Sequence, residues 1–253
     1  MIGNGCVIAI GGNESKRGAK DSILAAFVER AGGPAARIVV IPSASVEPEV
    51  RAEMYGRLFA RFGATDVRAV HAERGVTPAD LEAIRRATGI FVTGGDQKRL
   101  MEALRGTGAA EAIRMSVRSG AVYAGTSAGA SAVSERMLAG STRRRGTEVI
   151  SFGEGLGLVP DVIVDQHFAQ RRRLPRLIAA ARDHRLTGVG IDENTAIVWT
   201  SNGATVTGAG EVTIVDPEHR LEDARARSYR LHVLGRGARW EFGAGEEAEE
   251  GAA

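Results

Sequence analysis

The stretch Gly120-Ala-Val-Tyr-Ala-Gly125-Thr-Ser127-Ala-Gly129-Ala-Ser-Ala-Val133 decides the fold, because it joins an apolar strand to a helix through a tight turn. Residues 121–124 have strand character, and the small residues after Gly125 are compatible with a helix. Gly125, Ser127 and Gly129 form the pattern G-x-S-x-G. A serine on such a turn needs neighbours without side chains, and its hydroxyl is left exposed above the edge of the sheet. Ser127 is therefore a candidate nucleophile.

A structural interpretation of this stretch is also open, in which the small residues only let the helix pack closely on the strand. The catalytic interpretation gains from Ala128, whose backbone N–H lies at the start of the expected helix. A hydrogen-bond donor at a helix N-terminus stabilises a developing oxyanion. The rest of the chain decides between the two interpretations.

Short apolar runs alternate with longer amphipathic segments over the first three quarters of the chain. This alternation is typical of parallel strands joined by right-handed helical crossovers. The sequence predicts an α/β fold with a doubly wound, mostly parallel sheet covered on both faces. Expected strands are residues 6–10, 37–41, 66–70, 89–92, 121–124, 162–164 and 187–191, and expected helices are residues 21–31, 48–62, 78–86, 97–105 and 109–119.

Beyond Asn194 the pattern changes to short strands separated by turn signals such as Ser201-Asn202-Gly203. We expect antiparallel strands here, at residues 195–199, 204–207, 211–215, 229–234 and 239–242. The predicted organisation is a single domain over residues 1–242, with a parallel core at 5–193 and an antiparallel extension at 194–242. Residues 243–253 are rich in Gly, Ala and Glu and predict a disordered acidic tail.

Composition excludes several classes of protein. The net charge of +2 is too small to indicate a nucleic-acid partner. The single cysteine, Cys6, permits neither an internal disulfide nor a CxxC metal site, and we expect no metal and no cofactor. The N-terminus lacks a basic leader, and no stretch reaches the roughly 18 apolar residues of a membrane span. The sequence predicts a cytoplasmic protein without membrane contact.

Functional side chains are expected where the parallel strands end, because ligands of such sheets bind at the carboxyl edge. A serine nucleophile needs a base there, and two of the five histidines, His71 and His167, follow predicted strands. We favour His167, since Asp165 and Gln166 precede it and Phe168 follows it, whereas His71 leads into a charged segment. The polar groups after the strands lie at residues 11–14, 42–45, 71, 93–97, 125–127, 165–167 and 192–193.

Two further segments carry candidate binding groups. The backbone N–H of Gly95 is a second candidate oxyanion donor, with Gln97 facing the ligand; the alternative is a tight turn capped by Asp96. Arginines are concentrated after His167, where they suit recognition of carboxylates; the alternative is a solvated basic helix start. These arginines are Arg171, Arg172, Arg173 and Arg176.

The chain contains six motifs in order: Gly11-Gly12-x-Glu14, Thr93-Gly94-Gly95-Asp96-Gln97, Gly125-Thr126-Ser127-Ala128-Gly129-Ala130, Gly155-Leu156-Gly157-Leu158, Asp165-Gln166-His167-Phe168 and Gly190-Ile191-Asp192-Glu193. Together these motifs resemble the cyanophycinase family, which belongs to the serine peptidases that include the aspartyl dipeptidases. The resemblance covers residues 5–215 and implies a sheet like that of the class I glutamine amidotransferases, together with a homodimer. It implies hydrolysis of cyanophycin, a poly-aspartate with arginine on each side-chain carboxyl, to β-aspartyl-arginine dipeptides. By resemblance Ser127 is the nucleophile and His167 the base, and the substrate pocket consists of Gln97, Asp165, Gln166, Arg171, Arg173 and Arg176.

One departure from the family concerns the acid that completes the triad. In cyanophycinases a glutamate is expected in the loop between nucleophile and histidine, and here residues 139–148 hold arginines instead. Glu148 is the nearest acid; either it or another acid substitutes, or the protein is slow or has a different task. Loss of this carboxylate costs on the order of 10⁴ in rate in a well-studied triad.

We interpret the reaction as attack of Ser127 on a β-aspartyl (isopeptide) bond. The alternatives are an aspartyl or isoaspartyl dipeptidase acting on small peptides, and a catalytically impaired member that binds its ligand without cleaving it.

Overall fold

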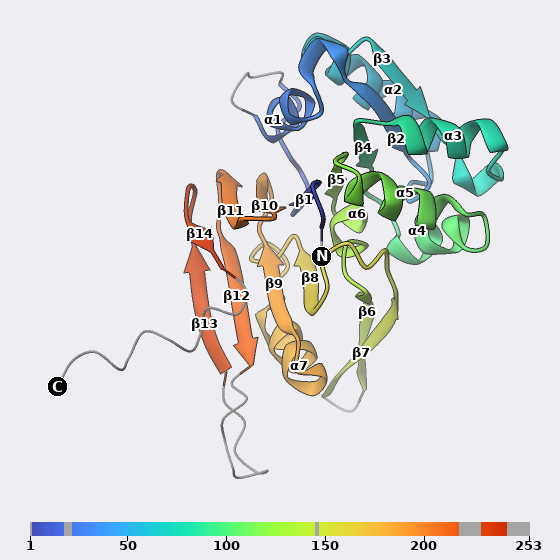
Figure 1. Ribbon diagram of the computed structural model, residues 1–253. Coiled ribbons are helices and arrows are strands. Elements are labelled where there is room, and N and C mark those ends of the chain that lie inside the picture. The colour runs from blue at the N-terminus through green and yellow to red at the C-terminus, as the bar shows by residue number, and fades with distance from the viewer. Residues whose placement is uncertain (1, 18–21, 145–146, 218–228, 242–253) are drawn as a thin grey trace.

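The main sheet has eight strands in the order β14-β11-β10-β1-β5-β4-β2-β3 (Figure 1). The computed structural model describes residues 2–17, 22–144, 147–217 and 229–241. Strands β1, β5, β4, β2 and β3 are parallel, and β10 pairs antiparallel with β1. The predicted α/β class is confirmed. The strands are β1 (Cys6–Ile10), β2 (Arg37–Ile41), β3 (Asp66–Ala69), β4 (Gly89–Val92), β5 (Val122–Thr126), β10 (Thr195–Thr200), β11 (Gly203–Gly208) and β14 (Arg239–Trp240).

Helices cover the parallel part of this sheet on both faces because successive strand residues point to opposite sides. Ile8 packs with Phe27 of α1 and Phe59 of α2 on one face, and Val7 lies in the core with Ile84 of α3 and Ile113 of α5 on the other. The doubly wound arrangement follows from this alternation. The helices are α1 (Ile23–Arg30), α2 (Pro48–Arg61), α3 (Pro78–Arg86), α4 (Gln97–Leu104), α5 (Ala109–Arg118) and α6 (Ala128–Ser131).

A second sheet of four strands has the order β13-β12-β9-β8. Its strands β8 (Val162–Gln166) and β9 (Thr187–Ile191) are parallel, while β12 (Val212–Pro217) and β13 (Tyr229–Leu234) are antiparallel additions. The sequence places β8 and β9 in the main sheet, and the structure differs because β10 occupies the edge of β1 that β8 would need. The helix α7 (Leu174–His184) covers one face of this second sheet (Figure 1).

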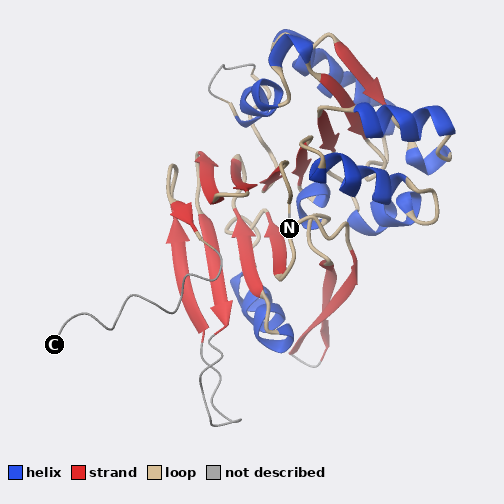
Figure 2. Ribbon diagram, viewed as in Figure 1, coloured by secondary structure: helices blue, strands red, loops and turns tan. Residues whose placement is uncertain are grey.

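The segment expected to be a loop around residue 148 contains an antiparallel hairpin of β6 (Arg136–Arg144) and β7 (Thr147–Glu154), drawn beside α7 in Figure 2. Leu138, Ile150 and Phe152 of this hairpin pack in one apolar cluster with Leu177 of α7. The hydrophobic pattern does not predict these two strands, because about half of their residues are polar and they do not alternate regularly with apolar ones. Within the described ranges, none of the helices has the length and apolar character needed to cross a bilayer. The predicted tail at 243–253 lies outside the described residues.

Candidate active site

The loop after β1 connects the three strand ends that form the site. Three successive carbonyl oxygens, those of Ile10, Gly11 and Gly12, accept hydrogen bonds from the N–H groups of Ser127 (2.9 Å), His167 (2.8 Å) and Asn194 (2.8 Å). These donors follow β5, β8 and β9. A single turn of backbone therefore sets the relative positions of segments that lie far apart in the sequence and belong to two different sheets.

Gly12 is needed in this loop for a steric reason. Its φ is 101°, and a Cβ atom built there would lie 2.3 Å from Cε1 of His167. Both the backbone conformation and the contact with the imidazole exclude a side chain. The His167 ring thus packs directly on the loop backbone.

Ser127 lies between β5 and α6 in a backbone conformation that L-residues rarely adopt. Its φ is 51° and its ψ is −104°, and such strain costs about 1–3 kcal/mol. The flanking glycines are required as predicted, since a Cβ at Gly125 would lie 2.3 Å from the Gly129 carbonyl oxygen and one at Gly129 would lie 2.6 Å from that of Val92. The side chain of Ser127 is held at the sheet edge, facing His167.

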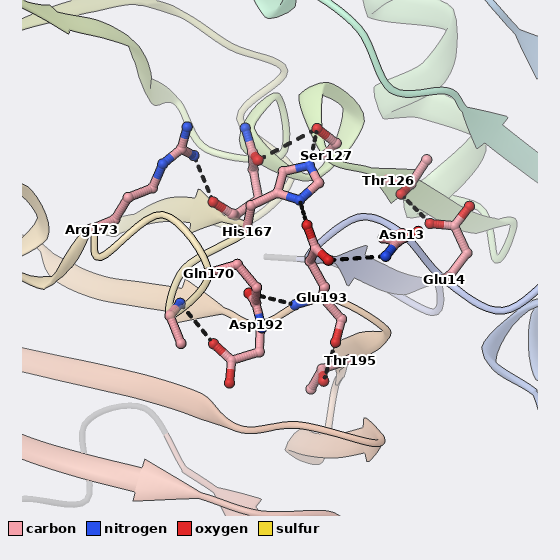
Figure 3. A network of polar contacts seen from close by, with 12 residues as sticks. Asn13, Glu14, Thr126, Ser127, His167, Gln170, Arg173, Asp192, Glu193 and Thr195 are labelled. Carbon is pink, nitrogen blue, oxygen red and sulfur yellow. Dashed lines mark hydrogen bonds and ion pairs between the residues drawn. The ribbon is translucent and has the colours of Figure 1, made fainter.

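A chain of hydrogen bonds joins Ser127, His167 and Glu193 (Figure 3). Ser127 Oγ lies 3.1 Å from His167 Nε2, and His167 Nδ1 lies 2.6 Å from Glu193 Oε1. The second carboxylate oxygen of Glu193 accepts a hydrogen bond from Asn13 Nδ2 at 3.0 Å. With Glu193 ionised, Nδ1–H donates to the carboxylate and Nε2 is left to accept the serine proton.

The charge state of Glu193 agrees with this assignment. The hydrogen bond from His167, followed by that from Asn13, lowers the pKa of the Glu193 carboxyl below its ordinary value. The backbone N–H of Glu193 also donates to Gln170 Oε1 at 3.1 Å, which fixes the residue from the side opposite the imidazole. Glu193 is therefore anchored as an anion beside Nδ1.

Glu193 is the partner of His167 Nδ1, a role that the sequence motifs do not predict for it. Glu148 is the nearest acid in the expected loop, and the structure places its backbone in β7, opposite that of Arg143 in the strand register. The contact with His167 Nδ1 comes from Glu193, which follows β9 and comes after the histidine in the chain. The signal was the Asp192-Glu193 pair at a predicted strand end.

The two segments that carry the predicted oxyanion donors both adjoin Ser127. Ala128 begins α6, and Gly94 is so close that a Cβ built on it would lie 3.3 Å from Ser127 Cβ. Gly95 has a φ of 148°, and a Cβ there would lie 2.0 Å from the Ala44 carbonyl oxygen. The glycine pair therefore lets the 94–95 backbone approach both Ser127 and the loop after β2.

The predicted pocket residues divide into two groups. Gln166 lies beside the serine, with its Oε1 atom 3.4 Å from Ser127 Oγ, and Arg171 is exposed near Glu193. Gln97, in contrast, donates from Nε2 to the Leu138 carbonyl oxygen at 2.9 Å and thereby joins α4 to β6. His71, the histidine not favoured, contacts Glu73 at 3.0 Å.

Asp165, Arg173 and Arg176 bind one another rather than an open surface. Asp165 is fully buried, and its carboxylate accepts from Arg173 Nη1 at 2.9 Å and from Arg176 Nε at 2.6 Å. Arg173 also donates to the Gln166 carbonyl oxygen at 2.6 Å. Burial, the largest cause, lowers the pKa of Arg173 in spite of the neighbouring carboxylate. Any effect of this cluster on a substrate is therefore indirect, through the position of Gln166 and His167.

The change Asp165→Ala should lower the free energy of unfolding by about 3–5 kcal/mol, because it leaves two arginines largely buried without their carboxylate. Urea unfolding followed by circular dichroism measures this. Glu53→Gln, which removes an exposed ion pair with Arg57, is the control and should change stability by less than about 1 kcal/mol. Equal losses in the two variants would contradict the role given to Asp165.

The sequence of the chain matches a known peptidase family. Residues 7–207 match the family model described as Peptidase family S51. The chain belongs to peptidase family S51. It is 41% identical to the cyanophycinase of Nostoc sp. over 92% of this chain and 84% of that protein, and 39% identical to the cyanophycinase of Geminocystis herdmanii over 92% of each. The cyanophycinase of Thermosynechococcus vestitus is 43% identical over 92% of this chain and 78% of its own length. Family membership and these relatives identify the S51 chain as a peptidase of the serine type.

Two solved structures share the fold of this S51 chain. A peptidase from an acI-B1 actinobacterium superposes with a TM-score of 0.69 at 22% identity, covering 94% of this chain and 97% of that one. A putative peptidase E from Listeria monocytogenes gives a TM-score of 0.59 at 20% identity, covering 81% of this chain and 99% of that one.

In the part of the chain that the structure describes, no group of three or more His, Cys, Asp or Glu side chains is arranged to hold a metal ion.

Proposed function

We propose that this S51 peptidase hydrolyses cyanophycin to β-aspartyl-arginine dipeptides, with Ser127 as nucleophile, His167 as general base and Glu193 as the orienting acid. The observation that carries the proposal is the hydrogen-bond chain from Ser127 Oγ through both imidazole nitrogens to Glu193. The cyanophycinases at about 40% identity support the substrate. The complete chain of contacts favours an active enzyme over an impaired, ligand-binding family member.

The reaction follows from these positions. His167 Nε2 takes the hydroxyl proton as Ser127 Oγ attacks the scissile carbonyl carbon, and the imidazolium is stabilised by Glu193 through Nδ1–H. The resulting oxyanion is stabilised by the backbone N–H groups of Gly95 and Ala128, as in other acyl transfers. The C–N bond then breaks and Nε2 returns the proton to the leaving amine. Water, deprotonated by Nε2, then attacks the acyl-serine ester, and Nε2 returns this proton to Ser127 Oγ as the ester bond breaks.

The product defines which bond is cut. Cyanophycin joins its aspartates through backbone amides and holds each arginine on a side-chain isopeptide bond. Release of β-aspartyl-arginine keeps the isopeptide bond and breaks backbone amides on both sides of one unit. The scissile bond is therefore a backbone amide, which corrects the isopeptide attack that we inferred from the sequence.

Product analysis tests the proposal against the dipeptidase alternative. Purified protein incubated with cyanophycin should release β-aspartyl-arginine, detected by liquid chromatography with mass spectrometry. Turnover of aspartyl or isoaspartyl dipeptides without turnover of the polymer would favour the dipeptidase. Free arginine as the first product would place the cleavage at the isopeptide bond and overturn the proposed reaction.

The proposal also includes a cytoplasmic location and a homodimer, both taken from the sequence analysis. The family resemblance implies an intracellular enzyme. The chain has a mass of 26.6 kDa, so a homodimer would sediment with twice this mass. Analytical ultracentrifugation distinguishes the dimer from a monomer.

A further inference from the structure

A cleft of about 430 Å³ opens in front of Ser127 and His167. It lies on the side of Ser127 formed by the loop after β1, by α2 and by the start of α4. Three cationic side chains from these separate segments line it, namely Lys16, Arg51 and Arg99. We call this hollow the Ser127 cleft.

The acids that line the Ser127 cleft already have partners. Glu14 is almost completely buried, and its carboxylate accepts from the hydroxyls of Tyr55 and Thr126 at 2.5 Å each and from Lys16 at 3.2 Å. Asp96 caps α4 by accepting from the N–H groups of Lys98 (2.7 Å) and Arg99 (3.2 Å). Glu14 is therefore engaged by three groups, and Asp96 binds the start of α4 and forms no ion pair with Arg51 or Arg99 among the described residues.

Arg51 and Arg99 are therefore the unmatched charges of the cleft. Among the described residues, neither guanidinium makes a hydrogen bond or an ion pair. Arg51 is half-buried on α2, and Arg99 is exposed on α4. This contrasts with Arg173 and Arg176, whose guanidinium groups are both bound to Asp165. Two free guanidinium groups beside a nucleophile favour an anionic ligand, and their planar fork suits carboxylates.

We infer that Arg51 and Arg99 form a carboxylate-binding subsite in the Ser127 cleft, which holds the free α-carboxylates of the substrate's arginyl groups. The inference rests on the proposed function, because every unit of cyanophycin carries such a carboxylate on its arginine. It assigns recognition of these carboxylates to residues on α2 and α4 instead of to Arg173 and Arg176. The subsite acts through binding, so it should affect KM more than kcat.

Kinetics of Arg51→Gln, Arg99→Gln and the double variant test the subsite. Each single change should raise KM for cyanophycin about ten-fold, with kcat changed little, since a charge-assisted hydrogen bond contributes about this factor. Lys98→Gln, which removes an exposed cation on α4 outside the cleft, is the matched control and should keep the parent KM. Parent KM values in the double variant would overturn the subsite.

A binding measurement separates failure of the subsite from failure of the proposed function. Calorimetry with the Ser127→Ala variant compares the binding of β-aspartyl-arginine with the binding of its C-terminal amide. The amide lacks the α-carboxylate of the arginine and keeps that of the aspartate. The acid should bind about ten-fold more tightly than the amide, and this preference should vanish when Arg51→Gln and Arg99→Gln are added. Equal binding of acid and amide, or no binding of either, refutes the subsite whatever the activity. A preserved preference in a protein that does not cleave cyanophycin would refute only the proposed function.

Discussion

Replacement of Ser127 by Ala should reduce kcat on cyanophycin by about 10⁶-fold, the loss seen when the serine of a Ser-His-acid triad is removed. The change deletes the oxygen that lies 3.1 Å from His167 Nε2, which is the nucleophile in the proposed reaction. The backbone strain at φ 51° is the same for Ala as for Ser, so the fold and the melting temperature should be retained.

Two measurements check this result. Turnover is measured by release of β-aspartyl-arginine, and labelling with a serine-directed fluorophosphonate reports the activated hydroxyl directly. Ser151→Ala, which removes a hydroxyl bound to the Gly140 carbonyl on the β6–β7 hairpin, is the control and should keep turnover and labelling. Turnover of Ser127→Ala above about 1% of the parent value would place the nucleophile elsewhere.

The sequence was most informative where local patterns carry the structure. Apolar runs matched to parallel strands gave β1, β2 and β4 with their observed bounds, and Gly125 and Gly129 flank Ser127 for the steric reason that the motif requires. The residues next to His167 favour it over His71 as the base, and in the structure its Nε2 atom lies 3.1 Å from Ser127 Oγ. Each of these inferences uses residues that lie close together in the chain.

The remaining features depend on contacts between distant segments, which one sequence does not specify. The displacement of β8 and β9 into a second sheet follows from the pairing of β1 with β10. Arginine patterns show where charge lies but not which arginine has a partner, so Arg173 could not be distinguished from Arg51. For the same reason the sequence does not identify Glu193 as the partner of His167, because the approach of Glu193 to His167 depends on the turn at Gly11 and Gly12.

Replacement of Glu193 by Gln should lower kcat on the order of 10⁴-fold with little change in KM, because the amide neither fixes the Nδ1–H tautomer nor stabilises the imidazolium. Glu193→Asp, which keeps the charge, should recover part of this loss. Glu148→Gln is the matched control and should keep the parent kcat, since the hydrogen bond of His167 Nδ1 is made with Glu193. A larger loss in Glu148→Gln than in Glu193→Gln would return the role of the acid to Glu148.

The lowered pKa of Glu193 makes the stability of the fold depend on pH. Because the folded pKa lies below that of the unfolded chain, about 4.3, the ionised carboxylate stabilises the fold above this pH. This contribution is lost as the pH falls through the lowered folded value. The difference in free energy of unfolding between parent and Glu193→Gln, measured by urea unfolding at a series of pH values, should therefore shrink only as the pH falls below about 4.3. A difference that already shrinks between pH 6 and 5 would mean that Glu193 is not held as an anion by His167 and Asn13.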